Sequence, residues 1–260
     1  MTGANSPLLE MRGITKRFGA ITALDHVDLW LYPGEVLGVV GDNGAGKSTL
    51  MKVLSGLYAA SVGDIVFDGR PVHLNSPRDA QDIGIEMVYQ DLALAGNLPV
   101  HENIYLGREP GRQRLGFKIV DRKLSRKMAK EHLDRLHINV KSVDQKVEEL
   151  SGGQAQAVAI ARATAFDARL VIMDEPTAAL AIKEVGKVLE LIKRLRDHGT
   201  SVILISHRMD DVFFVCDRVM ALFHGRNFEE SEIASTSRNE VIGWIMGTKG
   251  HTEALAHDRL

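Results

Sequence analysis

The segment that most constrains this chain is residues 41–48, which read Gly-Asp-Asn-Gly-Ala-Gly-Lys-Ser. They fit the phosphate-binding loop pattern G-x-x-x-x-G-K-[ST] without a gap. The apolar run at 36–40 predicts a buried strand before the loop, and residues 48–54 predict a helix after it, which Gly56 ends. A glycine-rich turn that matched by chance would lack these flanking elements. The loop therefore predicts that the chain binds a nucleoside triphosphate.

The loop pattern assigns a role to each of its residues. Glycines let backbone N–H groups converge on phosphate oxygens, and the start of the following helix adds positive potential. Lys47 is expected to reach the outer phosphates, and the Ser48 hydroxyl is expected to bind Mg²⁺. The remaining residues expected to surround the nucleotide are Gly41, Asp42, Asn43, Gly44, Ala45, Gly46 and Thr49.

An acidic pair closes a second apolar run. Residues 170–173 read Leu-Val-Ile-Met and predict a buried strand, after which Asp174 and Glu175 follow. An aspartate at the carboxyl end of such a strand, beside a phosphate loop, is expected to help hold Mg²⁺. Glu175 is then the candidate to orient or deprotonate the attacking water. Without the phosphate loop, a solvated acidic turn would be the better interpretation of this pair.

Residues 150–154 read Leu-Ser-Gly-Gly-Gln and lie between the phosphate loop and the acidic pair. With this set, the chain resembles the ATP-binding subunit of ABC transporters over roughly residues 8–247. The resemblance implies that Ser151, Gly152, Gly153 and Gln154 bind nucleotide from a partner copy, because this segment matches the family signature. It also implies that Glu175 is the catalytic glutamate and that Asp174 is the magnesium aspartate.

Three further residues match family positions. Phe18 matches the aromatic residue that stacks on adenine, with Tyr32 as the alternative. Gln90 matches the glutamine that touches Mg²⁺ and the attacking water and senses the membrane partner. His207, which follows the apolar run 202–205, matches the switch histidine and is expected to contact the γ-phosphate. Without the other motifs, Phe18 would be read as a core aromatic residue and His207 as a surface residue.

Longer segments are similar to the ATPases of monosaccharide importers, such as those for ribose, xylose and fructose. The resembling stretches are residues 40–46, 89–94, 102–109 and 173–180. This similarity implies uptake of a sugar through transmembrane permease subunits, with an extracytoplasmic sugar-binding protein. Many relatives fuse two ATPase halves, whereas this chain has one, so two copies would pair. An ABC subunit for another cargo, or for export, remains the alternative.

The chain departs from the family pattern at two positions. Ala155 stands where a basic residue usually follows the signature, and Ala181 stands where many members have aspartate. Sugar-importer ATPases often carry a small residue at the second position. Ala155 removes a charge near the expected interface between two copies, which leaves the strength of pairing open.

The pattern of elements predicts an α/β fold, a P-loop NTPase core with a mostly parallel sheet. Short strands around 8–40 and near 65–67 predict a small antiparallel sheet beside it, with residues 68–69 forming a hairpin turn. Residues 91–150 are expected to be an inserted helical subdomain, in which Asp121 caps a helix with apolar positions Leu124, Met128, Leu133 and Leu136. The core would comprise 8–90 and 151–247, and 248–260 would be a polar tail.

Composition excludes several other classes of function. The formal charge of −2 gives no general attraction to nucleic acid. The single cysteine, Cys216, rules out an internal disulfide and is expected to be buried. No apolar run reaches the ~18 residues of a membrane span, and the N-terminus does not read as a signal peptide. We therefore expect a protein on the cytoplasmic face of the membrane, attached through permeases.

Two non-transport classes of ABC ATPase are also possible. Those of DNA repair or chromosome maintenance insert a very long coiled coil between the phosphate loop and the signature, and this chain has no sustained heptads there. Those that act in translation carry two ATPase halves in one chain and basic linkers. Both features are absent from this sequence, so these classes are less favoured than transport.

Overall fold

A six-stranded sheet forms the centre of the computed structural model, which describes residues 6–114 and 117–248. Its strand order is β12-β11-β3-β10-β9-β6. Only β12 pairs antiparallel to its neighbour, so the predicted mostly parallel sheet is confirmed. The strands are β3 (Val36–Val40), β6 (Ile85–Val88), β9 (Leu170–Asp174), β10 (Ser201–Ile205), β11 (Arg218–Phe223) and β12 (Arg226–Glu232).

A four-stranded antiparallel sheet lies beside this core, in the order β2-β1-β4-β5. Its strands are β1 (Leu9–Phe18), β2 (Ile21–Leu31), β4 (Val62–Phe67) and β5 (Arg70–Val72). Asp68 and Gly69 form the turn between β4 and β5, and both have positive φ, 54° and 72°. That backbone matches the twist of a tight hairpin, so the predicted antiparallel sheet and its turn are confirmed.

The central strands are apolar at successive positions because both faces of the sheet are covered, and their residues join the two hydrophobic clusters in alternation. On β9, Val171 and Met173 join one hydrophobic cluster, whereas Leu170 and Ile172 join the other. The first cluster is completed by α5 (Gly152–Thr164), α6 (Ile182–Asp197), α7 (Met209–Val215) and α8 (Arg238–Ile245). The second is completed by α1 (Lys47–Leu54), α2 (Pro77–Asp82) and the antiparallel sheet. Cys216 is buried as expected, and its burial raises the pKa of the thiol.

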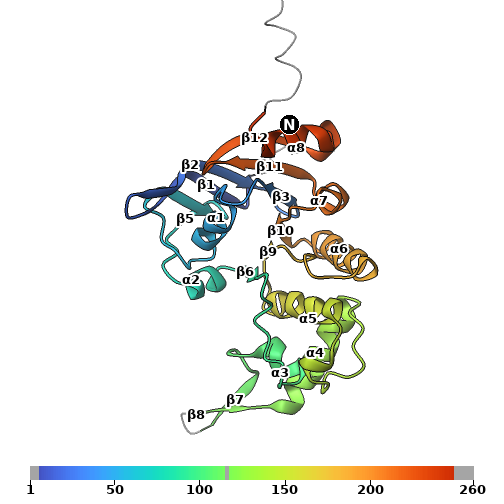
Figure 1. The fold of residues 1–260 in the computed structure, drawn as a ribbon. Helices are drawn as coiled ribbons and strands as arrows, with labels where there is room; N and C mark the ends of the chain where they lie inside the picture. Colours follow the sequence, from blue (N-terminus) through green and yellow to red (C-terminus); the bar gives the residue numbers. More distant parts are fainter. Residues whose placement is uncertain (1–5, 115–116, 249–260) are drawn as a thin grey trace, which may run out of the picture.

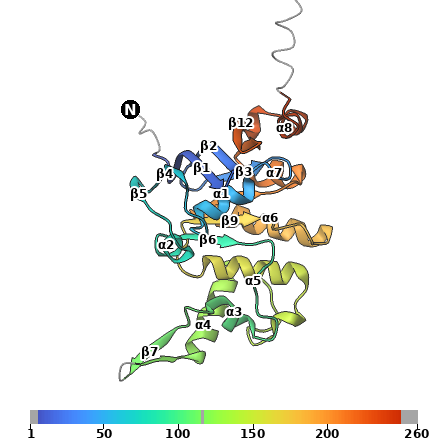
Figure 2. The ribbon, with the colours of Figure 1, turned by 60° about the vertical axis from the view of Figure 1, so that its left-hand side comes forward.

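A mainly helical region extends from the core at the end away from the antiparallel sheet (Figures 1 and 2). It contains α3 (Val100–Tyr105), α4 (Arg122–Arg135) and a 3-10 turn at Val147–Glu149. Asp121 caps α4 by accepting a hydrogen bond from the Leu124 N–H at 3.0 Å, as predicted. The sequence did not predict the antiparallel hairpin of β7 (Gly111–Arg114) and β8 (Phe117–Val120), which interrupts the expected all-helical segment.

The buried face of α4 also differs from the predicted one. Leu133 and Leu136 are buried, but Leu124 and Met128 are more than a third exposed. The residues that face inward from the first turns are Ser125 and Ala129. A small hydroxyl residue is buried there because His101 of α3 lies against it, so packing against a neighbour overrides apolar periodicity.

Helix α5 connects the helical region to the core, because it packs on α3 and also on β6 and α6. Near its carboxyl end, the carbonyl oxygen of Ala161 lies 2.9 Å from Nε2 of His132 on α4. The polar tail expected from residue 248 onwards lies outside the described residues, except for Thr248 itself.

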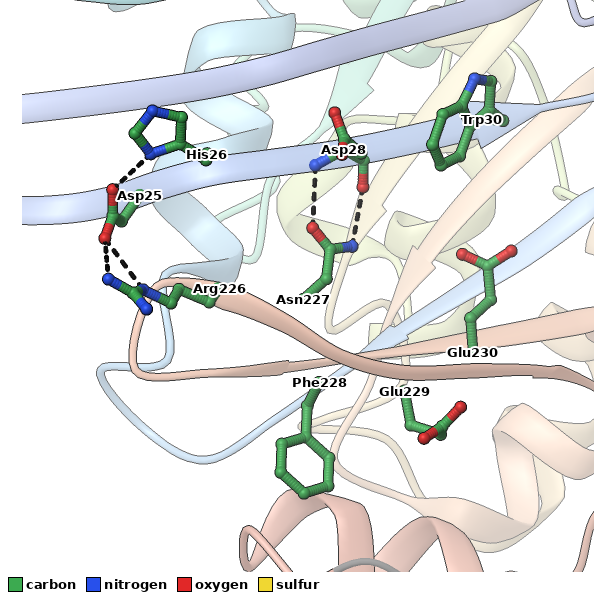
Figure 3. A pocket seen from close by; sticks show the side chains of 9 residues that line it. All are labelled: Asp25, His26, Asp28, Trp30, Arg226, Asn227, Phe228, Glu229 and Glu230. Atoms are coloured by element: carbon green, nitrogen blue, oxygen red, sulfur yellow. Dashed lines mark hydrogen bonds and ion pairs between the residues drawn. The ribbon is translucent and has the colours of Figure 1, made fainter.

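The two sheets meet where β2 approaches β12, and Asn227 bridges them (Figure 3). Its carboxamide accepts from the Asp28 N–H and donates to the Asp28 carbonyl, each at 2.8 Å. Next to this bridge, Asp25 pairs with Arg226 and with His26. The Asp25 N–H donates to the Gly225 carbonyl, and the Gly225 N–H donates to the Ala45 carbonyl at 3.0 Å. These hydrogen bonds therefore connect the junction of the two sheets to Ala45 in the phosphate loop.

Candidate active site

The phosphate loop leaves the carboxyl end of β3 and turns into α1. A Cβ atom at Gly41 would lie 2.4 Å from the carbonyl oxygen of Leu222, and one at Gly46 would lie 2.8 Å from a methyl group of Leu24. Gly46 also has a φ of 102°, which disfavours other residues. Within the described residues, Gly44 and Gly46 donate their N–H groups to no acceptor, and the first turn of α1 adds the free N–H groups of a helix start. The loop therefore offers several N–H donors to an anion.

Lys47 is the first residue of α1 and lies across the loop. Its Nζ atom donates to the carbonyl oxygens of Gly41 at 2.7 Å and Asp42 at 3.0 Å. Burial lowers the pKa of Lys47, although the carboxylates of Glu175 and Asp174 act in the opposite direction. The ammonium group is thus held at the loop and electrostatically linked to the two acids that end β9.

Asp174 is the last residue of β9, the neighbour of β10 in the sheet, and Glu175 follows it. Burial raises the pKa of Asp174, and the adjacent Glu175 raises it further, whereas Lys47 lowers it. Glu175 has a φ of 51°, a left-handed conformation that costs a non-glycine residue about 1–2 kcal/mol. Its N–H donates to the carbonyl oxygen of Ile205 at 3.0 Å, which fixes the turn.

The carboxylate of Glu175 faces the histidine that follows the next strand. Its Oε2 atom lies 2.8 Å from Nδ1 of His207, although that oxygen accepts no well-aligned hydrogen bond in the described part of the chain. The Glu175 side chain is mostly buried, and that of His207 is mostly exposed. Because this oxygen accepts no aligned hydrogen bond from the described residues, it has a lone pair with which to bind a water molecule that enters the site and to accept its proton.

Gln90 lies just beyond β6, on the other side of β9. Val88 pairs with Met173, so the register carries Gln90 toward the same sheet edge as the acidic pair. Its side chain is exposed. The role of Gln90 at a metal and a water molecule stays a prediction from the resemblance.

The donors at this edge fit Mg²⁺ bound together with a nucleotide. Mg²⁺ prefers oxygen ligands and in nucleotide sites takes only one or two from the protein, the rest being phosphate oxygens and water. Asp174 supplies a carboxylate here, and Ser48 of the phosphate loop supplies a hydroxyl. No cluster of three or more metal-ligating His, Cys, Asp or Glu side chains occurs among the described residues, so a fully protein-ligated metal centre is not present there.

Phe18 ends β1 at the hairpin with β2, and 41% of its surface is exposed. Its ring contacts that of Tyr58 edge to face, with centroids 5.2 Å apart. The adjoining part of β2 touches the phosphate loop, because Leu24 and Ala23 limit the space at Gly46. The structure therefore places a partly exposed aromatic ring on the hairpin that touches the loop, with Nζ of Lys16 5.1 Å from the ring centroid. Stacking of adenine on this ring stays a prediction.

Tyr32, the alternative platform, lies at the opposite end of β3 from the phosphate loop, which favours Phe18. It follows the end of β2 and precedes β3, whereas the phosphate loop follows β3. The two sites are thus at opposite ends of the same strand. The guanidinium of Arg218 also lies over the Tyr32 ring, 5.6 Å from its centroid.

We expect Phe18→Ala to raise the KM for ATP about tenfold, since stacking of a base on an aromatic ring contributes ~1–3 kcal/mol. The value of kcat should stay nearly unchanged, because stacking is equally present in the ground and transition states. Steady-state ATPase assays over a range of ATP concentrations measure both. Tyr32→Ala is the matched control, and an unaltered KM for Phe18→Ala would remove Phe18 from the adenine site.

The signature segment begins α5. Ser151 is the N-cap, and Gln154 completes a capping box with it through hydrogen bonds of 3.3 and 3.1 Å. The Gln154 side chain also donates to the carbonyl oxygen of Asn139 at 3.1 Å. Gly152 and Gly153 form the first turn, and a helix of 13 residues presents its positive end there. The positive end of this helix is compatible with the anion-binding role that the resemblance implies, which stays a prediction.

The structure does not bring the signature to the phosphate loop of the same chain. No hydrogen bond or ion pair among the described residues joins residues 41–48 to residues 151–154. The loop belongs to the core, and the signature begins the helix that joins the core to the helical region (Figure 1). The phosphate loop and the signature segment therefore lie apart in one copy.

Sequence reasoning missed two sets of supporting residues. Thr177, in the loop after the acidic pair, donates its hydroxyl to the buried carboxylate of Asp211 on α7. In the helical region, Arg108 bonds to the buried Glu86 of β6 at 2.5 Å, and its guanidinium lies 3.8 Å from the centroid of the Phe166 ring. The sequence signal was weak in both cases, because each pair joins residues that are far apart in the chain.

Comparison with known proteins places this architecture in a family. The family model described as ABC transporter matches residues 24–178. The chain is 44% identical over 250 residues to the fructose import ATP-binding protein FrcA of Rhizobium meliloti, covering 95% of this chain and 96% of that protein. It is 45% identical over 237 residues to the xylose/arabinose import ATP-binding protein XylG of Sulfolobus acidocaldarius, covering 91% and 92%.

Other similar proteins are longer or structurally characterised. The chain spans about half of the ribose import ATP-binding protein RbsA of Caldanaerobacter subterraneus, with 43% identity and 48% of that protein covered. A solved nucleotide-free ATP-binding cassette aligns with a TM-score of 0.78 and 28% identity, covering 87% of this chain and 92% of that one. A dimeric cassette with ADP and phosphate aligns with a TM-score of 0.72 and 28% identity, covering 86% and 98%. By these similarities and by its motifs, this chain belongs to the ABC transporter family, as one of its ATP-binding ATPase subunits.

Proposed function

We propose that this protein is the ATP-hydrolysing subunit of an importer for a monosaccharide. The observation that carries the ATPase role is the Glu175–His207 pair, which lies at the edge of the sheet where Lys47 crosses the phosphate loop. The sugar assignment is supported by the names of the relatives, which import fructose, xylose or arabinose, and ribose. The sequence segments that resemble monosaccharide importers point in the same direction.

The nucleotide would bind with its phosphates on the N–H groups of the loop and its base against Phe18. Asp174 and Ser48 would hold Mg²⁺ with phosphate oxygens, and Gln90 would contact it on the other side. When bound, the metal neutralises charge on the phosphates. Lys47 would then exchange its bonds with loop carbonyls for bonds with the outer phosphates, which it stabilises electrostatically.

Hydrolysis would depend on Glu175. Its carboxylate can accept a hydrogen bond from a water molecule and orient that water toward the terminal phosphorus atom. His207, on the neighbouring strand end, would hold the carboxylate through Nδ1 and contact the γ-phosphate with its exposed edge. The left-handed backbone at Glu175 and its bond to Ile205 fix this arrangement before substrate binds, which is how electrostatic catalysis avoids reorganisation.

Two copies would pair head to tail about a two-fold axis, because the loop and the signature lie apart in one chain. Each ATP would then lie between Lys47 of one copy and the signature of the other, from Ser151 to Gln154. The solved dimeric cassette with ADP and phosphate supports pairing as a property of such domains. Binding would close the pair, and hydrolysis would open it.

The subunit would act at the cytoplasmic face of the membrane through permease partners. No helix in the described part of the chain has both the length and the apolar character of a membrane span. An extracytoplasmic sugar-binding protein would deliver cargo to the permeases. The cargo would not contact this subunit, so its identity must be tested on the assembled transporter.

The decisive experiment is transport by the reconstituted complex. The subunit, its permeases and their binding protein are placed in proteoliposomes with ATP on the side of the ATPase, and uptake of labelled fructose, xylose and ribose is measured. We expect ATP-dependent uptake of at least one sugar, and stimulation of ATPase activity by the loaded binding protein. ATP-driven transport of only a non-sugar cargo, or transport in the outward direction, would contradict the proposal.

A further inference from the structure

The side chain of Glu184, on α6, lies directly over the signature glycines. A Cβ atom at Gly153 would lie 2.8 Å from Cβ of Glu184 and 3.0 Å from its carboxyl carbon. A Cβ atom at Gly152 would lie 3.9 Å from Oε2 of Glu184. The absence of a side chain at Gly153 is thus what lets Glu184 pack against the first turn of α5, whereas a Cβ atom at Gly152 would be at ordinary contact distance from its carboxylate.

The start of α6 explains why this carboxylate is free to lie there. Glu184 is the third residue of a helix whose N-cap is Ala181, and Ala181 makes no side-chain cap. A hydroxyl residue at that position would form a capping box with a glutamate three residues later, as Ser237 and Glu240 do at the start of α8. In the described part of the chain no hydrogen bond or ion pair holds the Glu184 carboxylate.

The first turn of α5 has positive potential, which favours a negative group. In the proposed sandwich, that group is the terminal phosphate of the ATP held by the other copy. The Glu184 carboxylate lies beside the same turn, against Gly153, without accepting a hydrogen bond from it. Two anions so close in space repel each other, so the carboxylate and the phosphate cannot both be favourably placed.

The same region offers the carboxylate a second position. A groove of about 770 Å³ runs along α5 and α6, and Lys183, Glu184, Lys187, Glu190 and Arg194 all line it. Lys187 lies three residues after Glu184, a spacing at which opposite charges on a helix attract each other. Rotation of the Glu184 side chain toward Lys187 would clear the signature turn.

We propose that Glu184 is an internal competitor for the terminal phosphate at the signature and thereby sets the affinity of ATP-driven pairing. This inference rests on the two-copy sandwich of the proposed function. When ATP arrives from the partner copy, the carboxylate leaves the glycines and turns to Lys187. Two ATP-bound copies therefore associate more weakly than they would if no carboxylate lay at the signature.

The test measures the dissociation constant of the ATP-bound dimer by analytical ultracentrifugation, with Glu175→Gln as the parent so that hydrolysis does not reopen the pair. Adding Glu184→Gln keeps the shape of the side chain and removes its charge. We expect the dissociation constant to fall about five- to tenfold, and the difference to shrink in 1 M salt, since the cause is charge repulsion. Glu190→Gln is the matched control, because Glu190 lines the same groove but does not contact the glycines.

A second variant tests whether Lys187 is the alternative partner of the Glu184 carboxylate. Lys187→Met in the parent should weaken pairing, because it removes the alternative partner of Glu184. In the presence of Glu184→Gln, the same change should have no effect. Unchanged melting temperatures would show that all variants are folded.

The results distinguish the competitor role of Glu184 from the two-copy sandwich on which it rests. An unchanged or weaker dimer for Glu184→Gln, with a parent that pairs, would overturn the competitor role and leave the sandwich intact. A parent that stays monomeric with ATP bound would overturn the sandwich itself, and the inference with it.

Discussion

Glu175→Gln is expected to lower the steady-state rate of ATP hydrolysis by a factor of about 10²–10⁴, the usual contribution of a general base. The amide keeps the size of the side chain but cannot accept the proton of water. Asp174 and Lys47 are unchanged, so nucleotide binding should survive. Because binding would close the proposed pair and hydrolysis would open it, the variant should form a stable dimer with two trapped ATP molecules.

The result is measured by phosphate release and by sedimentation with and without ATP, at high protein concentration because pairing without permeases is expected to be weak. In the reconstituted transporter, the variant should bind the permeases but fail to drive uptake. Glu190→Gln serves as the control for loss of an acidic charge elsewhere. Full turnover by Glu175→Gln would remove this residue from catalysis.

Lys47→Ala is expected to abolish hydrolysis and to weaken ATP binding. The ammonium group that stabilises the outer phosphates disappears, and the carbonyl oxygens of Gly41 and Asp42 lose their donor. The variant also removes one of the two lysines that favour the charged form of Asp174, the other being Lys52, and the weaker positive potential opposes the approach of a polyanion. The glycine cradle remains, so residual binding should persist.

Calorimetric titration with ATP and an ATPase assay separate the two effects for Lys47→Ala. Lys130→Ala, at an exposed position of α4, controls for the loss of one positive charge. Wild-type turnover by Lys47→Ala would mean that the phosphate loop has been wrongly assigned.

The parts of the fold that could be predicted are those that the local sequence specifies. Residues 36–40 and 170–173 are continuous apolar runs because both faces of their sheet are covered. The turn at Asp68 and Gly69 could be foreseen because few residues tolerate its backbone. The phosphate loop was the clearest case, since its glycines are required by close contacts with Leu222 and Leu24.

The parts that could not be predicted depend on contacts between distant residues. Helix α4 buries Ser125 because His101 lies against it, and the spacing of apolar residues in the sequence gives no sign of this contact. Tyr32 was a reasonable alternative to Phe18 until the fold placed it at the other end of β3. The contact of Glu184 with the signature arises because two helices pack closely at glycines, a feature of the tertiary structure alone.

Helix α5 would couple the proposed interface between two copies to the residues at its own carboxyl end. Its 13 residues form a rigid rod about 20 Å long, with the signature at one end. The other end leads to Phe166, which contacts Arg108 and, through it, Glu86 on the strand before Gln90. A tilt of about 10° around that end would move the signature by about 3 Å, roughly the length of a hydrogen bond. In the proposed two-copy sandwich, the helix would act as a lever arm, and a small displacement at its carboxyl end would make or break the contacts between the signature and ATP.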